Sequence, residues 1–130
     1  MEIVVSQAQG RVPVTVFKLK GDLSGEEPLQ SRAEQAHAAG MRDLLLDLSE
    51  VPYISSAGLR ALHVLYRLLR DGDPAGDDAA ERRGIIAGSY SSPHLKLLKP
   101  GKHARQALSV AGFDMFLEVY SEFSEALASF

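Results

Sequence analysis

Two adjacent serines, Ser55 and Ser56, stand where an apolar run gives way to a leucine-rich segment. The apolar residues from Ala57 to Arg70 have helical spacing, so both hydroxyls lie at the expected start of a helix. If that helix begins at Ala57, Ser56 is its N-cap and its side-chain oxygen accepts a backbone N–H of the first turn. Capping is therefore the purely structural explanation for a hydroxyl at this position.

The same position also suits phosphoryl chemistry. Unpaired N–H groups and the positive end of the helix dipole favour a phosphate, whose charge at neutral pH is about −1.5 to −2. A phosphoserine here would add bulk and negative charge while leaving the fold intact. Arg60, His63 and Arg67 fall on one polar face of the same helix, so a partner docked on that face would meet the new charge.

Other chemistries have weaker support. Ser56 and His63 are seven residues apart, a rise of about 10 Å on a helix, and no Gly-x-Ser-x-Gly elbow is present, so we expect no nucleophile and base pair. The remaining histidines, His37, His94 and His103, lack metal-ligand spacing, and the chain has no cysteine. The residues therefore give little support to nucleophilic catalysis or to a metal site, and we expect no cofactor.

A basic cluster lies farther along the chain, where an expected strand meets a helix. Its members are Lys96, Lys99, Lys102, His103 and Arg105. Such a cluster could receive an acidic partner or a nucleotide phosphate, although charges at a helix entrance are more often solvated surface. No Gly-x-x-x-x-Gly-Lys-Ser/Thr phosphate loop accompanies it.

Strands and helices alternate along the chain. The β-rich runs at 1–7 and 11–23 indicate a hairpin, and the leucine run Asp43–Leu48 indicates a strand covered on both faces. Further strands are expected at 94–99 and 115–120, and helices at 24–40, 57–70, 102–111 and 121–130. This order predicts an α/β fold with a mixed, largely parallel sheet.

Length and composition predict a single domain spanning residues 1–130. A formal charge of −3 offers no general attraction to nucleic acid or to anionic lipid. The absence of cysteine fits a reducing compartment, and no export signal or apolar run of about 18 residues is present, so we expect a cytoplasmic protein without membrane insertion. The polar, glycine-containing stretch at about 71–92 predicts a flexible insertion, within which Ile85 and Ile86 could form a short strand.

The run LLLDLSEVPYISSAGLRALHVL resembles the central segment of the STAS domain family of anti-sigma factor antagonists. The likeness consists of an apolar strand ending in Asp-Leu-Ser, a short turn, a serine-containing junction and Gly-Leu opening a helix. FKLKGDLSGEE resembles the family's second strand and its turn, and ARQALSVAGFDMFLEVYSEFSEAL its last helix, strand and helix. The resemblance implies the STAS fold: four or five strands in a mixed sheet, the N-terminal strand at an edge, and about four helices largely on one face.

The resemblance also implies a function. A family member binds an anti-sigma factor that has GHKL-type serine/threonine kinase activity, dissociates when it is phosphorylated, and is restored by a serine phosphatase. Matching the motif places the phospho-acceptor at Ser56, with Ser55 as a fallback. Ser55 and Ser24 stand at positions that are usually acidic in the family.

The partner-binding surface implied by the resemblance combines the turn after the second strand with the start of the central helix. Gly58 is expected to allow a close approach at the helix start. This predicted surface, called the rim below, consists of Asp22, Ser24, Ser55, Ser56, Gly58, Leu59, Arg60, His63 and Arg67. Serine in place of the usual aspartate leaves one alternative, a STAS module that is never phosphorylated and acts as a scaffold or a transporter-associated subunit.

Overall fold

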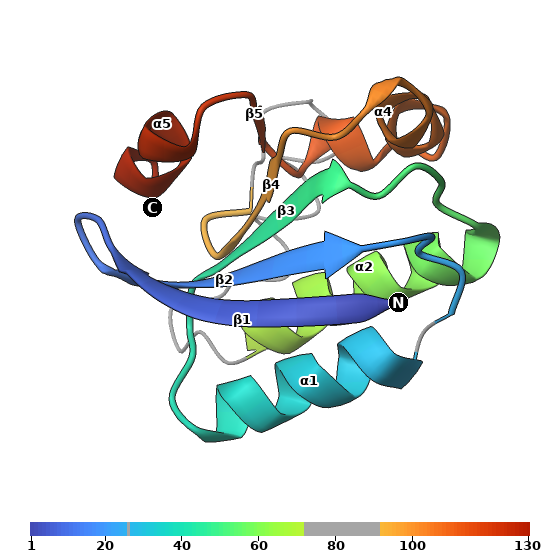
Figure 1. Cartoon of the computed structure of the whole chain (residues 1–130). Helices are drawn as coiled ribbons and strands as arrows, with labels where there is room; N and C mark the ends of the chain where they lie inside the picture. The colour runs from blue at the N-terminus through green and yellow to red at the C-terminus, as the bar shows by residue number, and fades with distance from the viewer. Residues whose placement is uncertain (26, 72–91) are drawn as a thin grey trace.

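The computed structural model describes residues 1–25, 27–71 and 92–130, and within them a five-stranded mixed sheet of order β1-β2-β3-β4-β5 (Figure 1). Its strands are β1 (Glu2–Gln9), β2 (Pro13–Lys20), β3 (Leu44–Glu50), β4 (Leu95–Leu98) and β5 (Val119–Tyr120). The hairpin β1–β2 is antiparallel, and the pairs from β2 to β5 are parallel. The predicted mixed sheet with the N-terminal strand at an edge is confirmed.

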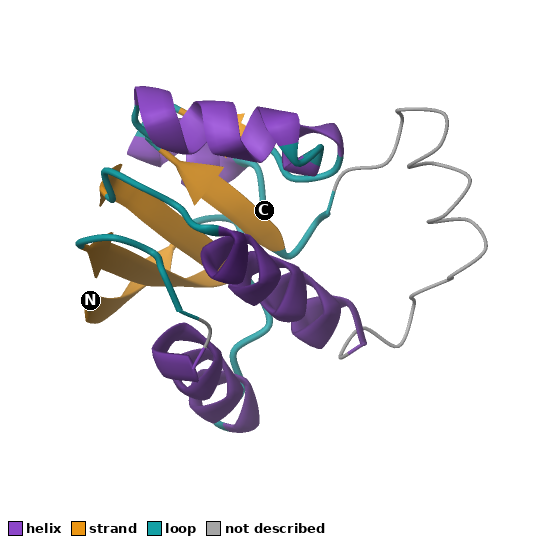
Figure 2. Ribbon diagram, turned by 90° about the vertical axis from the view of Figure 1, so that its right-hand side faces the viewer, coloured by secondary structure: helices purple, strands orange, loops and turns teal. Residues whose placement is uncertain are grey.

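The helices of the described residues divide between the two faces of the sheet. They are α1 (Glu27–Ala38), α2 (Ser56–Asp71), α4 (Lys102–Val110) and α5 (Phe123–Ala128). The first three contribute buried side chains to the main core, and Figure 2 shows α1 and α2 along the same side of the sheet. Only α5 contributes, through Ala126, to a smaller cluster on the opposite face. Packing largely on one face is therefore confirmed.

The leucine run of β3 is buried on both sides, as its composition predicted. Leu44, Leu46 and Leu48 belong to the main core, whereas Leu45 belongs to the smaller cluster. All four side chains are fully buried. Successive side chains of a strand point to opposite faces, so a strand between two packed layers needs apolar residues at every position.

The strand predicted at 115–120 is much shorter than expected. Only Val119–Tyr120 pairs with β4, and Phe113–Met115 forms a 3-10 turn, η1. Gly112 ends the preceding helix with a φ of 81°. The rings of Phe113 and Phe116 then pack edge to face, 5.5 Å apart, instead of alternating across a sheet. The strand predicted over 115–120 is therefore confirmed only at Val119–Tyr120.

The predicted flexible insertion at about 71–92 lies almost wholly outside the described residues, as do Ile85 and Ile86. Of its two ends, Asp71 belongs to α2, and Ser92 is buried with its N–H bonded to the Phe116 carbonyl.

The start of α2 is fastened to the turn after β2 by backbone hydrogen bonds. Leu23 donates its N–H to the Tyr53 carbonyl at 2.9 Å and accepts the Ser55 N–H at 2.9 Å, forming an isolated parallel bridge with Ile54. A Cβ on Gly58 would lie 2.2 Å from the Leu23 carbonyl oxygen. The expected close approach at Gly58 is confirmed, and only a residue without a side chain permits it.

A buried lysine anchors the layer on the opposite face. Lys96 of β4 is only 3% exposed, and its Nζ donates to the Ser129 carbonyl at 2.9 Å, just beyond α5. The ammonium also lies 5.1 Å from the centre of the Phe130 ring and 3.5 Å from a Glu118 carboxylate oxygen. The pKa of the neighbouring Tyr120 hydroxyl is raised, mainly by burial and secondly by a hydrogen bond with Glu118. This polar cluster joins α5 to the sheet.

Replacing Gly58 by alanine should lower the free energy of unfolding by about 2 kcal/mol, because the backbone of Leu23 cannot yield as a flexible side chain would. Chemical denaturation monitored by circular dichroism measures the change. Gly25→Ala is the matched control, since a Cβ there meets nothing within 4 Å. Equal stabilities of the two variants would contradict the contact.

Lys96→Ala should likewise cost about 2 kcal/mol, because it removes a buried side chain together with its hydrogen bond and ring contacts. Lys102→Ala, which shortens an exposed lysine at the start of α4, should change stability by less than about 0.5 kcal/mol. If urea midpoints of the two variants coincide, Lys96 is not an anchor.

Candidate functional site

The helix after the serine pair begins one residue earlier than predicted, and this changes the roles of the two hydroxyls. Because α2 starts at Ser56, Ser55 is the N-cap: its Oγ accepts the Gly58 N–H at 3.1 Å, and its carbonyl accepts the Leu59 N–H at 2.9 Å. The interpretation of Ser56 as the cap was wrong. The bridge to Leu23 holds the backbone of Ser55 outside the helix, which lets its side chain turn back onto the first turn.

Ser56 is consequently the exposed residue of the pair, and Ser55 is half-buried. The first turn of α2 contains no acidic side chain. No carboxylate of the first turn therefore offsets the positive end of the helix dipole. Modification of Ser56 would leave the cap on Gly58 in place.

The other predicted rim residues surround Ser56. Arg60, His63 and Arg67 are exposed and follow it along one face of α2, at the three- and four-residue steps that a helix face requires. Leu59 is half-buried and packs against the main core.

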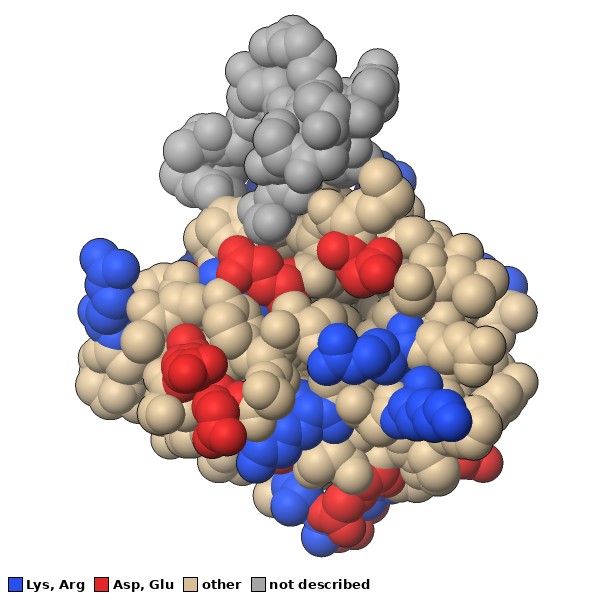
Figure 3. Space-filling model, turned by 90° about the horizontal axis from the view of Figure 1, so that it is seen from above, with Lys and Arg blue, Asp and Glu red and all other residues tan. Residues whose placement is uncertain are grey.

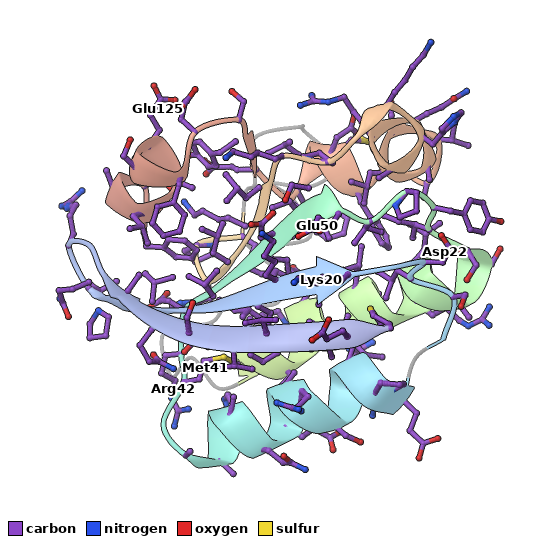
Figure 4. All side chains as sticks on the ribbon, viewed as in Figure 1. Lys20, Asp22, Met41, Arg42, Glu50 and Glu125 are labelled. Atoms are coloured by element: carbon purple, nitrogen blue, oxygen red, sulfur yellow. The ribbon has the colours of Figure 1, made fainter. Side chains whose placement is uncertain are left out.

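The turn after β2 completes this rim from a different part of the chain. Asp22 and Ser24 are exposed, and Leu23 between them is bonded to the residues just before α2. Figure 4 shows Asp22 at the end of the molecule where α2 begins. The structure thus places both predicted parts of the rim at one end of the sheet.

A groove of about 410 Å³ opens beside Ser56, between the start of α2 and α4. Most of its walls are apolar, and two of its side chains are strongly exposed, Tyr53 at 55% and Val110 at 83%. The groove is lined by Tyr53, Ile54, Ser56, Leu59, His103, Gln106, Ala107, Val110 and Ala111. The α4 wall was not part of the predicted rim, because no pattern in the sequence shows that α4 packs next to α2.

The basic cluster expected at the β4–α4 junction is split by the sheet. Lys96 points to the opposite face and is buried, whereas Lys99, Lys102, His103 and Arg105 are exposed. Of these, His103 lines the groove. Alternation along β4 is the reason, since Leu95 and Leu97 on either side of Lys96 enter the main core.

A larger hollow, of about 600 Å³, lies between the β1–β2 hairpin and the end of α1. It is lined by Val5, Gln7, Pro13, Thr15, Ala36, Ala39, Gly40, Met41, Arg42 and Asp43, so it contains none of the predicted site residues. Figure 4 shows Met41 and Arg42 at the opposite end of the molecule from Asp22. This hollow is therefore separate from the serine site.

The described residues contain no group of three or more histidine, aspartate or glutamate side chains placed to hold a metal ion. Over the same part of the chain, every helix is too short or too polar to cross a bilayer.

Comparison with solved structures identifies proteins of the same fold. An anti-sigma factor antagonist from Mycobacterium paratuberculosis is 20% identical, with 98% of this chain and 92% of that chain covered and a TM-score of 0.62. A Thermotoga maritima protein described as an anti-sigma factor antagonist is 16% identical, with coverages of 95% and 90% and a TM-score of 0.66. SpoIIAA of Bacillus in its phosphorylated form is 15% identical, with 96% of each chain covered and a TM-score of 0.62.

At these identities the structural similarity establishes the fold alone. No curated protein matches the sequence. The family model for the STAS domain, however, matches residues 5–73, which is more than half of the chain and includes the β2 turn, the serine pair and α2. The chain therefore belongs to the STAS domain family.

Proposed function

We propose that the chain is an anti-sigma factor antagonist controlled by phosphorylation of Ser56. In the unmodified state it binds an anti-sigma factor with GHKL-type serine/threonine kinase activity and frees the sigma factor. Phosphorylation by that kinase releases the complex, and a serine phosphatase restores binding. The protein acts in the cytoplasm through competition for a partner and performs no catalysis of its own.

The observation that carries this proposal is that the two serines have different structural roles. Ser55 supplies the structural cap, while Ser56 is exposed at the first residue of α2 and lines the groove. Both serine and aspartate are strong N-caps, so Ser55 can fill the capping role at a position where the family commonly has aspartate. Serine in place of aspartate at position 55 therefore preserves the cap at the start of α2.

A phosphate on Ser56 would act on the partner more than on the fold. Backbone N–H groups of the first turn and the helix dipole favour the dianion where it stands. A partner docked over the groove would have to bury that charge, at a cost of about 2 kcal/mol or more, which corresponds to roughly a 30-fold loss of affinity. The solved phosphorylated form of SpoIIAA shows that this fold accommodates a phosphoryl group in that protein.

Incubation with the anti-sigma factor kinase and ATP should add one phosphate to the wild-type chain, detected by intact-mass spectrometry. Ser56→Ala should remain unmodified, whereas Ser55→Ala should still be labelled, because only Ser56 is exposed at the helix start. An unmodified wild type that still binds its partner, in an assembly unaffected by ATP, would refute the switch and favour the scaffold or transporter-associated alternative.

The two serines should also differ in their effects on stability. Ser55→Ala removes the oxygen that accepts the Gly58 N–H and should lower the free energy of unfolding by about 1 kcal/mol, while Ser55→Asp should restore most of it. Ser56→Ala should change stability by less than about 0.5 kcal/mol. Thermal and urea denaturation test this order, and a larger loss at Ser56 would reverse the assignment of the cap.

A further inference from the structure

The N-terminal strand β1 has one edge that no other strand of the described residues covers. It stands at the end of the sheet order, and all eight of its residues pair with β2 (Figure 1). Its other edge is therefore a row of backbone N–H and C=O groups that can pair with a further strand.

The hydrogen bonds of β2 show which groups of β1 face outward. Thr15 donates its N–H to the Asp43 carbonyl just before β3, so odd-numbered residues of β2 face β3 and even-numbered ones face β1. The even-numbered residues of β2 lie opposite even-numbered residues of β1, as Val16 does opposite Ser6. The backbone groups that point to the open edge consequently belong to Ile3, Val5, Gln7 and Gln9.

The strand lacks the features that usually prevent an edge from pairing with another chain. Such features are lysines, prolines, bulges and a short length. β1 contains no lysine, arginine or proline, its one charged residue is Glu2, and its register with β2 is unbroken. The other edge strand, β5, has two residues, and charged side chains of both signs cover the side of the molecule formed by α4 and α5 (Figure 3).

Both faces of β1 are also incompletely covered within the chain. Val4 and Val5 point to opposite faces of the sheet, and each is 41% exposed. Val5 and Gln7 line the hollow of about 600 Å³ beside the end of α1. A strand added at this edge would bury part of these side chains, which supplies an apolar contribution beside the hydrogen bonds.

The sequence of β1 fits a second copy of itself. Two identical antiparallel strands are related by a two-fold axis, and hydrogen bonds form only where outward residues oppose outward residues. The register with Ser6 opposite Ser6 satisfies both conditions, because it sets Ile3 against Gln9 and Val5 against Gln7 on each side of the axis. All outward groups of both strands are then paired, whereas a shift by two residues sets an outward residue against one outside the partner strand.

Charge favours the same register. Glu2 would lie opposite Gly10 of the second copy, next to the exposed Arg11 of its hairpin turn. The two-fold axis repeats this contact at the other end of the strand pair. No acidic side chain of one β1 strand lies opposite an acidic side chain of the other.

We propose that β1 pairs with β1 of a second copy of this chain, antiparallel about a two-fold axis at Ser6, so that the two sheets join into one. None of the pairing residues lines the groove beside Ser56, and α4, which forms one wall of that groove, follows β4 at the other side of the sheet. The dimer therefore stands apart from the proposed function.

Sedimentation equilibrium of the full chain, from about 1 μM to 1 mM, tests the association. Pairing of two edges is a small interface, below about 1,200 Å², so we expect a monomer–dimer equilibrium with a dissociation constant of about 10 to 100 μM. A chain that stays monomeric throughout this range would overturn the proposal.

Charges placed on the two-fold axis test the register. Ser6→Glu and Ser6→Lys should each weaken the dimer at least about tenfold, because like charges then lie directly opposite each other. An equimolar mixture of the two variants should dimerise as well as the wild type, since glutamate now faces lysine. Ser109→Glu, at an exposed position of α4, is the matched control and should change the dissociation constant less than about twofold. An unweakened Ser6→Glu, or a mixture that stays monomeric, would refute this pairing.

Amide hydrogen exchange of the wild type provides a test that needs no variant. The amides of Val5 and Gln7 should exchange more slowly at 1 mM than at about 1 μM, because the dimer gives them hydrogen-bond partners. The amides of Val4 and Ser6, which face β2 in the monomer, should be protected at both concentrations. Equal exchange of Val5 and Gln7 at the two concentrations would contradict the strand pairing. These experiments use no kinase or ATP, so their failure leaves the phosphorylation switch untouched, and failure of the switch leaves the dimer untouched.

Discussion

The arrangement of the site depends on one backbone contact, the bridge between Leu23 and the residues that precede α2. Two hydrogen bonds of 2.9 Å hold the end of the β2 turn against this junction, and Gly58 allows the first turn of α2 to lie against the Leu23 carbonyl. These bonds join backbone groups, and the half-buried Ser55 hydroxyl also donates to the Leu23 carbonyl at 3.4 Å, so the position of the helix start does not depend on the exposed side chains around it. Those side chains can then vary with the partner while the frame stays constant.

The bridge also explains why two neighbouring serines have different roles. Ser55 is drawn into the junction by its N–H and turns its hydroxyl onto the Gly58 N–H, so it belongs to the frame. Ser56, one residue later, is the first residue of the helix and faces solvent. A hydroxyl that supports no part of the fold is free to be modified, and its position at the positive end of a helix suits a phosphate. Under the proposed function, structural and regulatory demands therefore fall on separate residues.

The sheet separates two chemical environments that are interleaved along the sequence. β4 alternates leucines that enter the main core with Lys96, which crosses to the opposite face and meets α5. The other cations of the same segment, Lys99, Lys102 and Arg105, remain exposed. A chain with a net negative charge therefore presents, next to Ser56, a mostly apolar groove whose lining residues include no carboxylate. This local surface, and not the net charge, is what a partner docked there would meet within a Debye length of about 8 to 10 Å.

Much of the fold followed from sequence alone. The leucine run of β3, the apolar stripe of α2 and the alternation of strands with helices predicted the mixed sheet, because burial imposes a period of two on strands and 3.6 on helices. The motif around Ile54 and Gly58 predicted that the serine pair and the turn after β2 form one surface. Only the tertiary structure decided which serine caps α2, since a one-residue difference in the helix start depends on the distant Leu23. Three further features also became known only from the tertiary structure: the position of α4 across the groove from the start of α2, the burial of Lys96 and the short length of β5. These outcomes depend on contacts between residues far apart in the chain, which no local pattern encodes.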